Sequence, residues 1–310
     1  MGKLAFIFPG QGSQEVGMGQ DICRSSKLAR EIYDITDEVL GYDLSKLIFA
    51  GPLEELTLTY NAQPAILANS IALYQELSQQ LTLKPDYMAG HSLGEYTALV
   101  ASGALSFADA VRLVHSRGEF MEAAVPDGVG TMAAVLGISR ELVEQTCAAV
   151  SDLESWVAAA NYNSPGQIVV SGHCAAVDRL IPAVKNCGGR AIPLSVSGPF
   201  HSKLMQPAAD RLIKLLSATQ FSELRVSVIS NVYAKPIDTS AVIVEALFKQ
   251  VSSAVMWEDS IRYLIDNGVD TFIEIGAGRI LSGLLRKIDR SVKVLSVRDS
   301  LTLKECVGGL

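Results

Sequence analysis

The sequence has little that would suggest a metalloprotein, a secreted protein or a nucleic-acid-binding protein. Its five cysteines are scattered and odd in number, and no two have C-x-x-C spacing, so neither a disulfide framework nor a zinc site is indicated. A formal net charge of -7, without a Lys/Arg run or an interleaved aromatic stripe, argues against a nucleic-acid partner. We therefore expect reduced thiols, no metal and a cytoplasmic location.

Long apolar segments are also missing. The apolar start Leu4–Phe8 is too short for a signal peptide or a membrane span, and Phe6 stands where a myristoylation signal requires Ser or Thr. We expect no membrane partner. With 310 residues, 49% of them hydrophobic, the chain can form one large domain, alone or carrying a smaller one, and disorder is excluded.

The clearest signal is the stretch Gly90-His91-Ser92-Leu93-Gly94, which has the pattern of a nucleophile elbow. The apolar run Tyr87–Ala89 before it is typical of a strand, and Leu93–Ala104 after it has helical spacing. A turn this tight leaves no room for side chains at its two glycines, and it directs the first amides of the helix toward whatever the serine attacks. Ser92 is therefore the candidate nucleophile.

Strands and helices alternate on both sides of the elbow. This alternation predicts an α/β fold, a large α/β-hydrolase-like domain with a mostly parallel sheet covered on both faces. After Pro126 the pattern changes to β-α-β-β-α-β, which is typical of a ferredoxin-like unit. We predict a large catalytic domain from residues 1–126 and 198–310, and an inserted ferredoxin-like subdomain over residues 127–197. The predicted strands are Lys3–Phe8, Tyr87–Ala89, Thr131–Ile138, Trp156–Ala160, Gln167–Ser171, Arg190–Val196, Val226–Ser230, Thr271–Ile275 and Val292–Val297. The predicted helices are Ile22–Leu40, Pro64–Leu81, Leu93–Ala104, Phe107–Ala124, Glu141–Val150, Ala175–Asn186, Met205–Ser217, Ser240–Val251, Trp257–Asn267 and Ile280–Ile288.

The first strand ends in the loop Pro9-Gly10-Gln11-Gly12-Ser13. It lacks the lysine of a P-loop and the glycine spacing of a dinucleotide site. Taken alone, it is as consistent with an ordinary strand-to-helix loop as with a functional one.

A serine nucleophile needs a base within hydrogen-bond reach, and the chain has only four histidines. His91 lies inside the elbow, where its side chain must point away from the serine. His115 falls on an amphipathic helix, and His173 ends a strand of the insert. His201 lies in the loop that re-enters the large domain, where such a fold brings later loops to the carboxyl edge of the sheet. We select His201 as the base.

A carboxylate behind this histidine is not evident. In the usual hydrolase order it would lie between Ser92 and His201. The acids there, Asp109, Glu119 and Asp127, fall on helices or in the linker. The sequence therefore favours a Ser-His pair that is oriented by a neutral group.

Five motifs together resemble the malonyl-CoA:acyl carrier protein transacylases of bacterial-type fatty acid synthesis, and the resemblance covers nearly the whole chain. Each motif alone is weak, but five in this order are specific. They are Phe8-Pro9-Gly10-Gln11-Gly12-Ser13-Gln14, Gly90-His91-Ser92-Leu93-Gly94-Glu95, Arg117, Asn163-Ser164-Pro165-Gly166-Gln167 and Pro199-Phe200-His201-Ser202.

The resemblance implies a role for each matching residue. It assigns the acylated serine to Ser92 and its partner to His201. It implies an oxyanion hole made by the backbone amides of Gln11 and Leu93, which agrees with the geometry expected of an elbow. It also implies that Gln250 supports the histidine through a carbonyl.

Arg117 matches the family's arginine that binds the free carboxylate of the malonyl group. A guanidinium offers a two-pronged match to a carboxylate, and in a dry pocket this pairing discriminates malonyl from acetyl. Phe200, directly before the histidine, is the family's choice where the acyl group is unbranched malonyl.

The implied reaction is ping-pong transfer. Ser92 would attack the thioester of malonyl-CoA, and the thiol of phosphopantetheine on acyl carrier protein would then take the malonyl group from the serine. No cofactor is implied beyond the coenzyme A thioester, which is a substrate. We expect a monomer.

Acyl carrier proteins are acidic, so a local basic patch must bind the partner. Two groups qualify, one around a late helix and one in the insert. They are Arg279, Arg286, Lys287 and Arg290, and Lys185 and Arg190.

Three alternatives remain at this point. A serine hydrolase or thioesterase of α/β-hydrolase type would use the same elbow, with water as acceptor and an acid behind His201. A carrier-protein docking module with a decayed site would not form acyl-serine. The same transferase could also use another acyl-CoA donor. The host compartment, bacterial cytoplasm or organelle matrix, is open as well.

Overall fold

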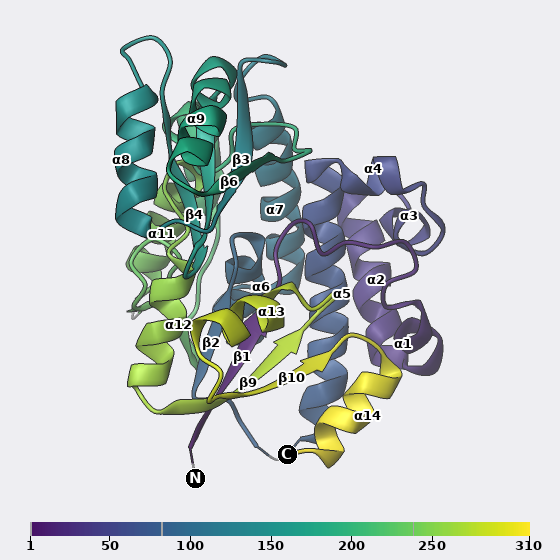
Figure 1. The fold of residues 1–310 in the computed structure, drawn as a ribbon. Coiled ribbons are helices and arrows are strands. Elements are labelled where there is room, and N and C mark those ends of the chain that lie inside the picture. Colours follow the sequence, from purple (N-terminus) through teal and green to yellow (C-terminus); the bar gives the residue numbers. More distant parts are fainter. Residues whose placement is uncertain (1, 82, 238) are drawn as a thin grey trace.

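The structure is a computed structural model that describes residues 2–81, 83–237 and 239–310. It contains a six-stranded sheet of order β10-β9-β1-β2-β7-β8 and a four-stranded sheet of order β4-β5-β3-β6 (Figure 1). In the larger sheet the first five strands are parallel, and only β8 is antiparallel to its neighbour. All pairings in the smaller sheet are antiparallel. The prediction of a mixed α/β fold with a mostly parallel sheet is confirmed.

The large sheet is built from β1 (Lys3–Phe8), β2 (Tyr87–Gly90), β7 (Ser227–Ile229), β8 (Pro236–Ile237), β9 (Val269–Ile275) and β10 (Lys293–Val297). Its helices before the insert are α1 (Gln20–Ser25), α2 (Lys27–Leu40), α3 (Leu44–Ala50), α4 (Leu53–Thr57), α5 (Thr59–Gln80), α6 (Leu93–Ala101) and α7 (Phe107–Glu122). Those after it are α10 (Gln206–Ala218), α11 (Ser240–Ser252), α12 (Trp257–Asp266), α13 (Ile280–Ile288) and α14 (Ser300–Gly308).

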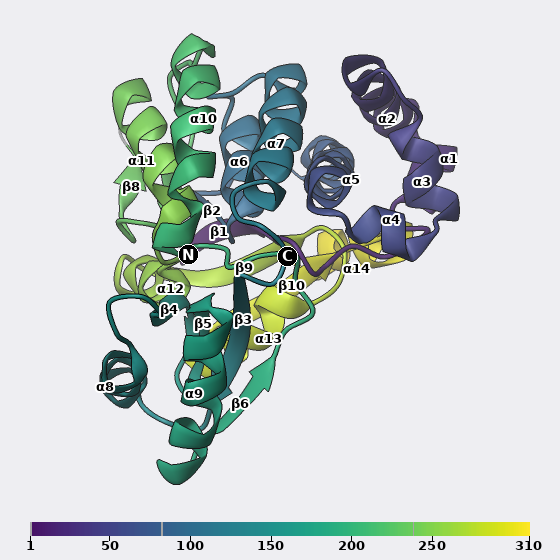
Figure 2. The same cartoon turned by 90° about the horizontal axis from the view of Figure 1, so that it is seen from above.

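Helices cover both faces of the large sheet, and side-chain alternation in β1 shows how. Phe6 and Phe8 belong to the core cluster formed with α5, α6 and α7, whereas Ala5 and Ile7 belong to the cluster formed with α12 and α13. Alternate residues of a strand point to opposite faces, so a strand buried on both faces is apolar throughout. Figure 2 shows α5, α6, α7, α10 and α11 side by side along one face of the sheet.

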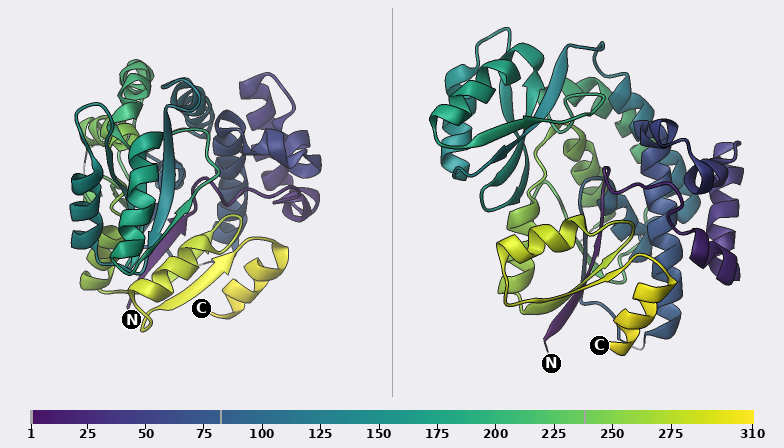
Figure 3. Two further views of the ribbon diagram at one scale, coloured as in Figure 1. Left: turned by 45° about the horizontal axis from the view of Figure 1, so that its top comes forward. Right: turned by 45° about the vertical axis from the view of Figure 1, so that its right-hand side comes forward.

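The smaller sheet forms with α8 (Arg140–Val150) and α9 (Cys174–Asn186) a separate unit with a core of its own. Its strands are β3 (Gly130–Leu136), β4 (Val157–Ser164), β5 (Gln167–His173) and β6 (Arg190–Pro193). The order β-α-β-β-α-β is the predicted one. These elements all lie within residues 127–197. The limits of the subdomain, 127 and 197, stay a prediction. The unit stands beyond the carboxyl ends of the parallel strands, away from both termini (Figures 1 and 3).

Several contacts join this unit to the large domain. The edge of β4 pairs with the segment before α12, through an Asn161–Val255 bridge. Arg140 of α8 forms an ion pair of 3.0 Å with Asp259 of α12, and Lys287 of α13 donates to the side chain of Gln167.

Several short or terminal elements were not predicted, and one predicted helix is divided. The segment 22–40 forms two helices because Ser26 is extended and caps α2, its side chain accepting from the amide of Ala29. The unpredicted elements are α3, α4, β8, α14 and a 3-10 helix over Lys203–Met205.

Candidate active site

Ser92 stands at the turn between β2 and α6. Its φ of 52° lies in the left-handed region, which residues other than glycine seldom adopt. A Cβ on Gly90 would lie 1.9 Å from the backbone of Gly94, and one on Gly94 would lie 2.1 Å from the carbonyl oxygen of Phe8. The expected lack of room at both glycines is therefore confirmed, and the serine is held at the N-terminus of α6.

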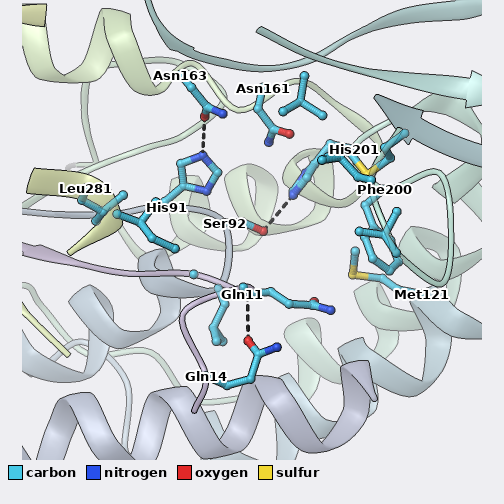
Figure 4. A pocket seen from close by; sticks show the side chains of 18 of the residues that line it. Gln11, Gln14, His91, Ser92, Met121, Asn161, Asn163, Phe200, His201 and Leu281 are labelled. Atoms are coloured by element: carbon cyan, nitrogen blue, oxygen red, sulfur yellow. Dashed lines mark hydrogen bonds between the residues drawn. The ribbon is translucent and has the colours of Figure 1, made fainter. Parts of the chain in front are cut away.

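His201 reaches the serine from the segment that leaves the insert (Figure 4). Its Nε2 lies 2.8 Å from Ser92 Oγ, and its Nδ1 lies 2.8 Å from the backbone carbonyl oxygen of Gln250 in α11. Because Nδ1 faces an acceptor, it holds the ring proton, and Nε2 is left free to accept the proton of the serine. The group behind the histidine is thus a neutral carbonyl. The backbone of His201 also has a positive φ, 56°, so both members of the pair stand in a sparsely populated conformation.

None of the three acids considered above, Asp109, Glu119 and Asp127, forms a hydrogen bond or ion pair with His201 in the described residues. Asp127 and Glu119 are exposed, and Asp109 is partly exposed and bonded to Arg112 of its own helix. Glu119 lies 3.8 Å from the ring of His115.

The Gln250 side chain joins several parts of the site. Its Oε1 accepts from Arg117 at 3.0 Å, and its Nε2 donates to the carbonyl oxygen of Ser92 at 3.0 Å and to Glu95 at 2.7 Å. Asn231, in the loop after β7, accepts from the Ser92 amide at 2.6 Å and donates to Gly90 O at 2.7 Å. Amide side chains thus hold the backbone of the elbow at Gly90 and at Ser92.

Arg117 is buried in α7, with 1% of its surface exposed. Its guanidinium donates to Gln63 at 2.8 Å, and to Ser92 Oγ and Gln250 at 3.0 Å. Within the described residues it forms no ion pair with a carboxylate, and its Nε has no hydrogen-bond partner. A buried cation whose direct hydrogen-bond partners are all neutral is costly unless an anion lies nearby or joins it. The guanidinium could therefore bind an anionic group.

The first loop lies against the elbow. A Cβ on Gly10 would come within 2.4 Å of the His91 carbonyl oxygen, so Gln11 is held next to the serine. Gln11 and Leu93 both line the cavity at Ser92. In the described part of the chain neither backbone amide donates a hydrogen bond, so both are available to an incoming oxyanion.

A cavity of about 270 Å³ opens onto the serine and lies between the large domain and the insert. The large domain contributes, besides Ser92 and His201, residues of the first loop, α7 and α13, whereas the insert contributes residues of β3, β4 and β5. Met121 and Phe200 form one wall, as seen in Figure 4. Asn161 and Asn163 of β4 also line the cavity.

His91 points away from Ser92, as predicted. Its Nε2 lies 2.8 Å from the side-chain oxygen of Asn163, and its ring packs 5.6 Å from that of Trp257. Burial lowers the pKa of His91. The contact joins the elbow to the insert (Figure 4).

Burial changes the acidity of two further groups. It lowers the pKa of His201 to about 3, with a smaller contribution from the nearby Arg117, so the ring is neutral and able to act as a base. It raises the pKa of Glu95 to about 7, against the lowering effects of its hydrogen bonds and of Arg117.

Sequence reasoning missed three residues of this network: Gln63, Asn231 and Glu95. Asn231 directly follows a buried parallel strand, which is where such sheets carry functional groups. Gln63 is polar in an otherwise apolar helix. Glu95 was quoted within the elbow motif but was given no role.

No group of three His, Cys, Asp or Glu side chains in residues 2–81, 83–237 and 239–310 could hold a metal ion. Over the same residues, no helix has both the length and the apolar character needed to span a membrane.

Comparison with known proteins gives one consistent result. The model of a family described as acyl transferase domain matches residues 5–301. A malonyl CoA-acyl carrier protein transacylase of Bacillus subtilis (strain 168) is 50% identical over 305 residues, 98% of this chain and 96% of the relative. Among solved structures, an acyl carrier protein S-malonyltransferase of Vibrio cholerae has a TM-score of 0.96 at 40% identity, covering 98% and 99% of the two chains. A malonyl-transacylase in complex with a type II PKS acyl-carrier protein has a TM-score of 0.97 at 38% identity, covering 99% and 100%.

Proposed function

The chain belongs to the acyl transferase family, and within it to the malonyl-CoA:acyl carrier protein transacylases, and we propose that it transfers the malonyl group through an ester on Ser92. The observation that carries this mechanism is the hydrogen-bonded pair of Ser92 and a neutral His201, beside a buried arginine whose direct hydrogen-bond partners are all uncharged.

In the first half-reaction, Ser92 Oγ attacks the thioester carbonyl of malonyl-CoA while His201 Nε2 takes its proton. The carbonyl of Gln250 holds the opposite ring nitrogen and stabilises the imidazolium. The amides of Gln11 and Leu93 donate to the oxyanion. His201 then gives the proton to the leaving sulfur, and coenzyme A departs as the thiol.

Arg117 binds the free carboxylate of the malonyl group. In the free protein one of its nitrogens donates to the serine hydroxyl, so a carboxylate bound there would lie next to the reacting atom. Two charge-assisted hydrogen bonds in a dry pocket favour malonyl over acetyl. Phe200 and Met121 close the wall of the pocket, which suits an unbranched acyl group.

In the second half-reaction, the phosphopantetheine thiol of acyl carrier protein enters the same pocket. It gives its proton to His201 and takes the malonyl group, which restores the free serine. Each bond is made and broken by groups of the chain and its two substrates, so the proposal includes no cofactor. A monomer in the cytoplasm, as expected from the sequence, is part of the proposal.

Of the two basic patches, the one on α13 is better situated for the carrier protein. Arg286 and Arg290 are exposed, and neither forms an ion pair within the described residues. The same helix lines the catalytic cavity with Leu281 and Leu284. A carrier protein bound to α13 would therefore have its prosthetic arm at the entrance.

The serine hydrolase remains the second candidate because the elbow is common to both chemistries. It is disfavoured by the neutral carbonyl behind His201 and by the buried arginine. We also propose that the large domain resembles α/β hydrolases, and this resemblance rests on the strand-turn-helix of the elbow.

Intact mass after incubation with malonyl-CoA, without carrier protein, tests the mechanism. We expect one malonyl adduct that is absent in Ser92→Ala and present in Ser252→Ala, a matched change at a partly exposed serine. Addition of phosphopantetheinylated carrier protein should discharge the adduct. Steady release of malonate without an adduct would instead indicate a hydrolase.

The docking surface is tested by the second half-reaction alone. Arg286→Glu with Arg290→Glu should raise the KM for carrier protein about tenfold or more, because charge steers such encounters, and malonylation by malonyl-CoA should be unchanged. Lys185→Glu on the insert is the matched control. An equal rise of this KM in both variants would contradict docking at α13.

A further inference from the structure

Glu95 is a buried carboxylate that the mechanism above does not use. It is the third residue of α6 and is fully buried. Its Oε2 accepts from the Asn231 amide at 3.0 Å and from Gln250 Nε2 at 2.7 Å. Its other oxygen, Oε1, has no hydrogen-bond partner within the described residues. An unpartnered carboxylate oxygen in a dry site favours the protonated form.

One side chain connects this acid to Arg117. Gln250 accepts from Arg117 through Oε1 and donates to Glu95 through Nε2, at 3.0 Å and 2.7 Å. The amide dipole of Gln250 thus runs between a buried cation and a buried acid. In the free protein Glu95 is the acid through which the charge of Arg117 is compensated.

The elements packed against α6 are α5, α7, β1, β2 and β7. Among the described residues of these elements, Arg117 of α7 is the charged group that acts on the pKa of Glu95. The neighbouring titratable group is Tyr96 of α6 itself, whose pKa is raised by burial so that it stays neutral. His201, across the serine, is neutral as well.

A malonyl carboxylate at Arg117 would add a second negative charge to the buried network of Glu95, Gln250 and Arg117. Two buried anions would then share one cation, and the acid with the unpartnered oxygen is the one that can accept a proton. We propose that Glu95 takes up a proton when the malonyl group is bound at Arg117, so that the substrate replaces Glu95 as the counter-ion of the arginine. This rests on the proposed function, in which Arg117 holds the malonyl carboxylate.

The proton comes from solvent and binds Oε1, where no existing hydrogen bond has to break. No bond of the substrate changes in this step. Acylation itself is neutral in protons, because the serine proton leaves on the thiol of coenzyme A. Proton uptake is therefore an additional and measurable event. An acetyl group brings no carboxylate and should cause none.

The size of the uptake follows from the pKa of Glu95, which burial raises to about 7 in the free protein. At pH 7.5 about one quarter of Glu95 is then protonated in the free protein, and a malonyl carboxylate at Arg117 raises the pKa of Glu95 further. A tenfold shift of this protonation equilibrium takes up about half a proton per malonylated serine. The uptake should fall toward zero at pH 5.5, where Glu95 is already protonated, and above pH 9.5, where it stays ionised.

The test is stopped-flow mixing of the protein with malonyl-CoA or acetyl-CoA, in weak buffer with a pH indicator dye. Intact mass on the same samples reports the acyl adduct. We expect about half a proton per adduct with malonyl-CoA and less than about 0.1 with acetyl-CoA. Coenzyme A is released in both, so any contribution of its thiol cancels. Absence of a malonyl adduct would contradict the proposed function, whereas an adduct without proton uptake would overturn only the role of Glu95.

Glu95→Gln is the matched variant. The glutamine can turn its oxygen toward Asn231 and Gln250 and keep both hydrogen bonds, while its amide occupies the unpartnered side. The malonylated variant should take up less than about 0.1 proton. Undiminished uptake in this variant would assign the proton to another group. If the variant does not fold, the pH profile of the wild type decides, because uptake that is the same for both acyl groups or independent of pH would overturn the proposal.

Discussion

Replacement of Arg117 should change the choice of acyl donor far more than it changes the chemistry of the serine. The guanidinium is buried and donates to Ser92, Gln63 and Gln250, without a carboxylate partner in the described residues. In Arg117→Ala the malonyl carboxylate would enter a dry pocket without a cation. Malonyl-CoA should therefore become a poor donor.

The magnitude can be worked from the contacts. Two charge-assisted hydrogen bonds are worth about 1.5–3 kcal/mol each, and water admitted by the truncation offsets part of this. A net loss of about 3–4 kcal/mol corresponds to a factor of about 10² to 10³. The loss of the contact between Arg117 and the serine hydroxyl affects both donors, so it cancels in the ratio of malonyl to acetyl transfer. That ratio of kcat/KM values should fall by two to three orders of magnitude.

The assay is the rate of acyl adduct formation from each coenzyme A thioester, followed by quenched-flow mass spectrometry. Arg117→Lys keeps the charge but not the two-pronged geometry, and it should lie between wild type and Arg117→Ala. Arg112→Ala, at an exposed position of the same helix, should change the ratio less than twofold. An equal fall for malonyl and acetyl in Arg117→Ala would refute a carboxylate-binding role.

Three further outcomes follow from the contacts of the site. His201→Ala should slow acylation about 10²- to 10⁴-fold, but Gln250→Ala only about tenfold, because the backbone carbonyl of Gln250 remains behind the ring; single-turnover rates separate the two. Burial lowers the pKa of His201 to about 3, so its NMR signals should show no titration between pH 5 and 8; a midpoint near 6.5 would contradict this. The unfolded chain binds that proton at a higher pH, so this group removes stability as pH falls from about 6.5 toward 3. Glu274→Ala should cost about 2–3 kcal/mol in urea unfolding, because the Glu274 carboxylate accepts from the amides of Leu281 and Ser282 at the start of α13.

The elements that the sequence predicts well are those whose signal is local. The apolar run of β1 and the glycine spacing of the elbow can be recognised locally. A strand buried on both faces is apolar throughout, and a Cβ on Gly90 would clash with Gly94, four residues away. The division of the first long helix at Ser26 was missed because the apolar periodicity continues across it. The short strand β8 was missed because it exists only by pairing with β7.

The residues of the candidate site also differ in how well the sequence predicts them. Ser92 and His201 could be proposed from the elbow and from the small number of histidines, and the contact between them is present. The network of Glu95, Asn231 and Gln250 could not be assembled, because its members are joined by hydrogen bonds between residues up to 155 positions apart. Side-chain amides also leave no periodic pattern in a sequence. What the sequence offered for Gln250 was a single matching residue.

The neutral partner of His201 is consistent with an anionic substrate. A carboxylate behind the histidine would stabilise the imidazolium more strongly than a carbonyl does. It would also be a second acid in a pocket where, in our proposal, the buried Arg117 binds the carboxylate of the acyl group. Such an acid would compete for the arginine, or repel the substrate through a medium of low dielectric. With the Gln250 carbonyl as partner, His201 is oriented without added charge, and Glu95 is left as the one acid of the network. The lack of an acid behind the histidine is therefore the arrangement that electrostatics favours for a malonyl donor, and it disfavours a hydrolase of neutral esters.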